Sequence, residues 1–141
     1  MIELLQELRV VQTGGQIFFA FLLTIAFTPR FAAASATERA VYGWDVFAVA
    51  ASMAFLVAPV AVHRLNFGRR IRPVLLTIAN ISAVVGLMFM LAGIVLGIVL
   101  ISLVVFPDSV WLLPVAAGGV MAACWILLPL AIRLTVPRDT D

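Results

Sequence analysis

The sequence predicts an all-α integral membrane protein, a four-helix bundle with both termini in the cytoplasm. Three observations carry this prediction: an apolar composition, four long apolar stretches and a one-sided distribution of arginines. Hydrophobic residues make up 65% of the 141 residues and charged residues only 11%. In soluble domains roughly half of the residues are apolar and roughly a quarter are charged. This composition excludes a soluble monomer, and the chain has room for one transmembrane domain.

The first two spans are expected over residues 10–29 and 42–63. Each crossing needs about 20 apolar residues. An amphipathic turn or two precedes the first span, which ends near Pro29. Tyr42 and Trp44 open the second span as an aromatic anchor at the membrane surface.

The third and fourth spans are expected over residues 74–106 and 110–132. Pro73 suits the first turn of the third helix. This helix exceeds the hydrocarbon thickness of roughly 30 Å, so it must tilt or project. Pro107, Asp108 and Ser109 form the turn to the fourth helix, in which we expect Pro129 to introduce a kink.

The arginines favour one orientation, with both termini inside the inner (plasma) membrane. The termini and the loop between the second and third spans carry Arg9, Arg64, Arg69, Arg70, Arg72, Arg133 and Arg138, and the opposite side carries Arg30 and Arg39. The positive-inside rule then places both termini in the cytoplasm and disfavours dual topology. We expect Arg64, Arg69, Arg70 and Arg72 to contact anionic lipid headgroups. A signal-peptidase site at Ala34-Ser35-Ala36 remains an alternative reading of the first apolar run.

A polar stripe follows one face of the first span and supplies the candidate pathway residues. It contains Gln6, Arg9, Thr13, Gln16, Ala20 and Thr24, with Gln12 at its edge. Lipid disfavours such a face, so it should meet the bundle interior, a subunit interface or a water-filled path. One interpretation is hydrogen bonding between helices; the other is an ion pathway lined by Gln12, Thr13, Gln16 and Thr24.

The second and third spans add two further patterns. Asp45, Ser52, Pro59 and His63 share a face of the second span. Asp45 in the first turn and His63 in the last would each complement the helix dipole; alternatively, His63 is a pH-sensitive gate. Gly86, Gly93 and Gly97 form a small-residue face for helix packing in the third span.

Several classes of chemistry find no support in the sequence. No charged residue falls near the centre of an expected span, which disfavours classical proton antiport. One His and one Cys cannot provide bis-His haem ligation or a four-ligand metal site. Without a phosphate-binding loop or a nucleophile and its base, we expect no enzymatic activity, no cofactor and no binding to nucleic acid.

Residues 3–105 resemble the domain of unknown function 6328 family, an uncharacterised actinobacterial family. The resemblance rests on Arg9-Val10, Gln12-Thr13-Gly14, Gln16, Phe19, Phe21-Leu22-Leu23-Thr24, Phe27 and Arg30-Phe31, followed by Ala58-Pro59-Val60-Ala61, His63-Arg64 and Phe67. It implies a small four-helix inner-membrane protein. Sequences of this type often carry the label sodium:proton antiporter, so the resemblance also implies ion handling. It implies no site residues.

Two functional hypotheses follow. The first is an oligomeric channel or transporter for a monovalent ion, because four helices alone enclose little space for a permeating ion. The second is an accessory or scaffolding subunit of a larger membrane complex, in which the glycine face and the polar stripe are docking surfaces. In both cases we expect a homo-oligomer or a membrane-protein partner.

Overall fold

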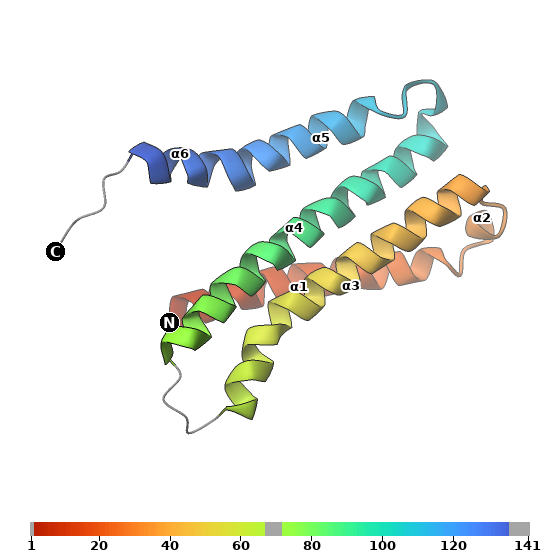
Figure 1. The fold of residues 1–141 in the computed structure, drawn as a ribbon. Helices are drawn as coiled ribbons and strands as arrows, with labels where there is room; N and C mark the ends of the chain where they lie inside the picture. The colour runs from red at the N-terminus through yellow and green to blue at the C-terminus, as the bar shows by residue number, and fades with distance from the viewer. Residues whose placement is uncertain (1, 67–71, 136–141) are drawn as a thin grey trace.

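The computed structural model describes residues 2–66 and 72–135, and every regular element in these ranges is a helix (Figure 1). The all-α fold class is thus confirmed for the described residues. In chain order the elements are α1 (Ile2–Ile25), α2 (Pro29–Ala32), α3 (Ala36–Leu65), α4 (Arg72–Val105), the 3₁₀ turn η1 (Pro107–Ser109), α5 (Leu112–Ala122), the π-helical turn η2 (Ala123–Leu127) and α6 (Leu128–Thr135).

Three helical segments of the described chain are long and apolar enough to cross a membrane. They are α3, residues Leu75–Val105 of α4, and the continuous run Leu112–Thr135 that joins α5, η2 and α6. The apolar part of α1, Arg9–Ile25, is shorter. The chain is therefore a membrane protein by the length and composition of its helices.

The start of α3 is fixed by a capping box. The Ser35 hydroxyl accepts a hydrogen bond from the Glu38 backbone N–H at 3.2 Å, and the Glu38 carboxylate accepts one from the Ser35 N–H. This reciprocal pair satisfies two backbone donors that a helix start leaves open. Arg30 adds an ion pair to Glu38 at 2.7 Å. The helix therefore begins at Ala36, well before the expected start near Tyr42.

The core of the molecule is the interface between α3 and α4, where glycines allow close approach. Gly86 and Gly93 are buried against α3. A Cβ atom at Gly93 would lie 2.6 Å from Cγ2 of Val49, and one at Gly86 would lie 2.8 Å from Cγ of Leu56. On α3 the buried positions Glu38, Asp45, Ser52 and Pro59 recur every seven residues, the spacing of helices that pack along a shared seam.

Helix α1 covers this interface with its apolar side. Val11 and Phe18 pack against the core pair Leu56 and Met90, and Leu22 is buried. Gly15 makes the approach possible, because a Cβ there would overlap the terminal methyl group of Met53 and lie 2.6 Å from that of Met90.

The last helical run packs against α4 through α5 and contributes little to the core. Its one buried residue among those described is Pro114. A Cβ at Gly118 would lie 3.3 Å from Cγ2 of Val95 of α4, closer than ordinary van der Waals contact, so α5 approaches α4 closely at this glycine. The π-helical turn comes just before Pro129, which lacks a backbone donor, and Figure 1 shows the chain changing direction there.

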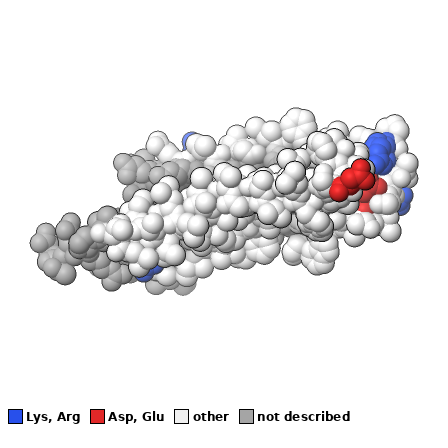
Figure 2. Space-filling view, turned by 90° about the horizontal axis from the view of Figure 1, so that it is seen from above, with Lys and Arg blue, Asp and Glu red and all other residues white. Residues whose placement is uncertain are grey.

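Charged side chains gather at the two ends of the long molecule. Figure 2 shows a face on which the middle is free of charged residues. One end of the molecule contains the start of α1, the last turn of α3 and the first turn of α4 (Figure 1). The other end contains α2 and η1. This distribution matches a molecule that crosses a bilayer along its length.

Candidate functional site

Asp45 is the most unusual polar residue of the described chain. Its side chain is completely buried, with 0% exposed, and neither carboxylate oxygen has a hydrogen-bond partner. Most buried polar groups in proteins have at least one partner, and a buried charge without one is costly. A buried carboxylate left in this state is a strong indication of a functional site.

The glycines of α4 create the space that the carboxylate occupies. A Cβ at Gly93 would lie 3.5 Å from Oδ1 of Asp45, and one at Gly97 would lie 3.3 Å from Oδ2. The Gly97 position is also 3.5 Å from Cζ of Phe18 on α1. Three helices therefore meet at Asp45, with glycine backbone on one side and an aromatic ring on another.

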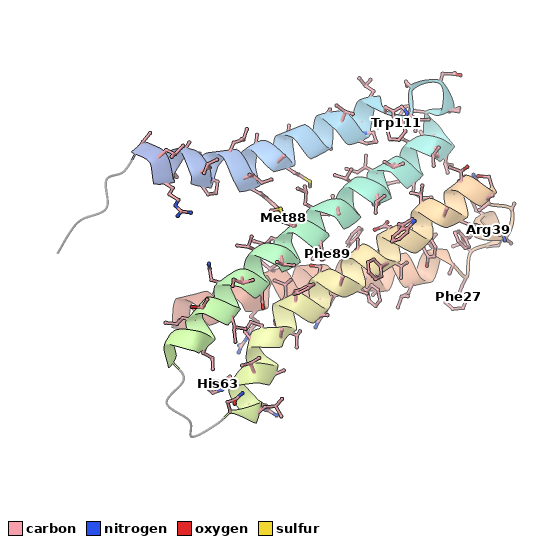
Figure 3. The ribbon with its side chains drawn as sticks, viewed as in Figure 1. Phe27, Arg39, His63, Met88, Phe89 and Trp111 are labelled. Atoms are coloured by element: carbon pink, nitrogen blue, oxygen red, sulfur yellow. The ribbon has the colours of Figure 1, made fainter. Side chains whose placement is uncertain are left out.

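The remaining surroundings are largely apolar. At about 100° per residue on a helix, Met53 and Tyr42 lie on the α1 side of Asp45. Trp44, Phe47 and Phe55 lie on its opposite side. The Phe55 ring stacks on Phe89 of α4 with centroids 5.7 Å apart, and Phe47 contacts the same ring edge-on at 6.4 Å. These ring contacts join α3 to α4 through Phe89, which Figure 3 labels on α4.

The position of Asp45 overturns one expectation from the sequence. Asp45 is the tenth residue of α3, so about 14 Å of helix precede it. It does not lie in the first turn and does not cap the helix dipole, a role that the Ser35–Glu38 box fills. Asp45 therefore lies buried within α3, about 8 Å along the helix from its midpoint, and the expectation that no charged residue falls near the centre of a span is unchanged.

Other polar groups of the interface are paired across helices. The Ser52 hydroxyl donates to the Gly86 carbonyl at 2.8 Å, and the Tyr42 hydroxyl donates to the Leu22 carbonyl at 3.0 Å. Both contacts leave Asp45 unpaired. The hydroxyl of Ser102 is also buried and unpartnered, but Ser102 lies nine residues after Gly93, half a helical revolution away from the face that carries that glycine.

Gln12 is the predicted pathway residue that the structure turns inward. Its side-chain amide donates to the Leu56 carbonyl at 2.7 Å. Pro59 follows three residues later, where its missing N–H weakens the backbone ladder of α3, and Figure 1 shows α3 bending in its last turns. Pro59 leaves the carbonyl of Phe55 without its usual backbone donor, and the observed interhelical bond goes to the next carbonyl, that of Leu56.

The other pathway candidates are exposed on the outside of α1. Gln16, Thr13 and Thr24 have exposed side chains, and the two threonines donate to the carbonyls of Arg9 and Ala20 one turn earlier in the same helix. Within a single chain these residues do not face the bundle interior, the first of the three expected surroundings; a subunit interface or a water-filled path stays a prediction. The close fit of Gly15 against Met53 and Met90 directs the neighbouring apolar face inward instead.

The remaining candidates lie at the ends of the helices or in the core. His63 and Arg64 are exposed in the last turn of α3, about 27 Å along the helix from Asp45 (Figure 3). Arg69 and Arg70 lie outside the described residues, and Arg72 is the first residue of α4. Gly86, Gly93 and Gly97 lie at the α3–α4 interface, where the latter two frame Asp45.

Comparison with known proteins identifies the family. The model of a family of unknown function, DUF6328, matches residues 1–129. The chain belongs to the DUF6328 family. The resemblance in the sequence was expected to cover residues 3–105, and the match to the family model extends further, to residue 129. The matched part therefore includes α5, η2 and the first two residues of α6. Neither the curated proteins nor the solved structures contain a match to this chain.

Proposed function

We propose that this protein is a small membrane transporter for a monovalent ion and that Asp45 is the group that binds the ion. One observation carries the proposal: a carboxylate with 0% exposure and no hydrogen-bond partner lies inside an apolar helix. Ionisable residues in membrane helices are costly, and they mark ion pathways and proton relays. A purely structural helix would be more stable with an apolar residue at this position.

Transport by purified protein in liposomes tests the proposal. Flux of H⁺, Na⁺ and K⁺ is measured separately in wild type and in Asp45→Asn, which keeps the side-chain shape and removes the charge. We expect flux of one of these ions, reduced at least about tenfold in Asp45→Asn. Asp108→Asn is the matched control, because Asp108 is exposed in η1, and it should retain wild-type flux. Equal flux in wild type and Asp45→Asn would contradict the proposal.

The proposed topology has four spans, with α1 as the shortest, and both termini on the cytoplasmic side of the inner membrane. What supports it is the position of Arg9, Arg64 and Arg133 towards one end and of Arg30 and Arg39 at the other. Positive charges concentrate on the cytoplasmic side of such proteins. The arginine-rich end would also attract anionic lipid headgroups.

An accessory or scaffolding role is the second candidate, and the outer face of α1 favours it. The Gln16 amide is exposed on this face, where lipid offers it no hydrogen bonds, so a protein neighbour would stabilise it. We propose a second copy of the chain as that neighbour. Gln16→Leu should then weaken the oligomer in lipid discs, and Ile17→Leu, an exposed apolar control on the same turn, should not.

A further inference from the structure

We infer that the species bound by Asp45 is a proton, and that a dehydrated metal cation is excluded from this site. The inference rests on the proposed function, which it makes specific. It follows from the atoms that surround the carboxylate and from what each type of ion requires of its ligands.

A metal cation that leaves water needs several oxygen ligands to replace its hydration shell. Around Asp45 the structure places the glycine backbone of α4, the Val49 side chain and the Phe18 ring. The described part of the chain brings together no group of three His, Cys, Asp or Glu side chains. A single carboxylate would leave most of the coordination sphere of Na⁺ or K⁺ facing hydrocarbon.

The nearest hydroxyl groups do not complete such a site. Ser52 lies seven residues further along α3, about 10 Å away along the helix, and its hydroxyl is bonded to the Gly86 carbonyl. Tyr42 is one turn earlier, and its hydroxyl is bonded to Leu22 of α1. Each hydroxyl oxygen keeps lone pairs while it donates, but one hydroxyl added to the Asp45 carboxylate would still leave a cation with far fewer oxygen ligands than its hydration shell supplies.

A proton has none of these requirements. It adds to one carboxylate oxygen, forms an O–H bond and changes the charge of Asp45 from −1 to 0. The charge that would otherwise lie unpaired in an apolar environment disappears, together with its desolvation cost. Release is the reverse step, with water as the proton acceptor, and it restores the unpaired charge and its desolvation cost.

We expect the proton to arrive from the α2 end of the molecule. A cavity of about 220 Å³ lies between the α1–α2 corner and the end of α4, and its walls include Glu38, Arg30 and Leu100. Glu38 precedes Asp45 on α3 by seven residues, and Leu100 follows Gly97 on α4 by three. The cavity wall therefore begins about two helical turns from Asp45 on α3. The opposite end of α3 is about 30 Å from Asp45 along the helix, so the α2 end is the shorter route.

Infrared difference spectroscopy on the full chain in lipid tests the inference, because an un-ionised carboxylic acid has its own C=O stretching band. We expect a band that titrates reversibly with pH, is missing in Asp45→Asn and remains in Asp108→Asn. Replacing Na⁺ or K⁺ by a large organic cation at constant pH should leave it unchanged. A band that Na⁺ or K⁺ removes, or spectra of Asp45→Asn and wild type that agree at every pH, would overturn the inference.

A second measurement on wild-type protein covers the case in which Asp45→Asn does not fold. Dicyclohexylcarbodiimide modifies protonated carboxyl groups in apolar surroundings, and mass spectrometry of peptides locates the adduct. We expect an adduct on Asp45 whose yield depends on pH and is unaffected by Na⁺ or K⁺; protection by either ion overturns the inference. If the infrared band behaves as expected but no ion is transported, the proposed function fails and the inference stands.

Discussion

Gly93 is the residue at which α4 comes closest to the side chains around Asp45. Its missing Cβ leaves room for Cγ2 of Val49 and for the Asp45 carboxylate. Interiors of proteins are close-packed, so an added methyl group here has to displace one of these neighbours. The space around Asp45 thus depends on the absent side chain of Gly93, together with that of Gly97.

We predict that Gly93→Ala destabilises the protein by about 1–3 kcal/mol, the usual cost of overpacking. The matched control is Gly119→Ala, because a Cβ at Gly119 meets nothing within 4 Å. That variant should be as stable as wild type or more so, since alanine is the better helix former. Thermal unfolding in detergent measures both, and equal stability of the two variants would refute close packing at Gly93.

At the scale of whole elements, the attachment of α1 to α3 depends on a few contacts near Pro59. The Gln12 amide bonds to the Leu56 carbonyl at 2.7 Å, next to the point where Pro59 interrupts the backbone ladder. One turn after Gln12 on α1, Gly15 packs closely against Met53 and Met90. These contacts fix the rotation of α1 about its own axis.

We predict that Gln12→Leu destabilises the protein by about 0.6–2 kcal/mol, the range for hydrogen bonds between membrane helices. Gln16→Leu, one turn away and exposed, should leave the stability of the monomer unchanged. Unfolding of dilute protein in detergent compares the two variants. A larger loss in Gln16→Leu would mean that α1 is rotated relative to the structure.

The cavity at the α2 end gives a second prediction at this scale. Leu100 lines it from α4, so Leu100→Trp should fill it and slow the reaction of Asp45 with dicyclohexylcarbodiimide several-fold. The infrared band of Asp45 should persist, because the binding site itself is unchanged. Ile98→Trp, on the same helix and absent from the cavity lining, is the control and should react at the wild-type rate.

The sequence predicted the helical class and the approximate helices but not the rotation or register that define the site. The polar stripe on α1 was expected to meet the bundle interior, a subunit interface or a water-filled path, and only the packing of Gly15 shows that the apolar face of α1 points inward. The start of α3 is readable in the sequence from Ser35 and Glu38, a capping-box spacing. If the start of α3 is taken from this capping box and not from the aromatic anchor at Tyr42, Asp45 lies in the third turn of the helix. The sequence does not show that the Asp45 carboxylate lacks a hydrogen-bond partner, because this depends on how three helices pack.

At the scale of the whole molecule, the arrangement requires the two ends to face opposite sides of the membrane. We predict that Gln6→Cys and Ser109→Cys, in a Cys124→Ala background, react with a membrane-impermeant maleimide from opposite sides. Gln6→Cys should react in inverted vesicles and Ser109→Cys in right-side-out vesicles, because the proposed topology puts the arginine-rich end in the cytoplasm. Reaction of both from the same side would refute the topology.

The central claim is that Asp45 takes up a proton inside the membrane part of the molecule. Rapid pH steps on proteoliposomes adsorbed to a sensor electrode measure this uptake as a transient displacement of charge. We predict a transient current in wild type and in Asp108→Asn and none in Asp45→Asn. A current of wild-type size in folded Asp45→Asn would contradict the claim.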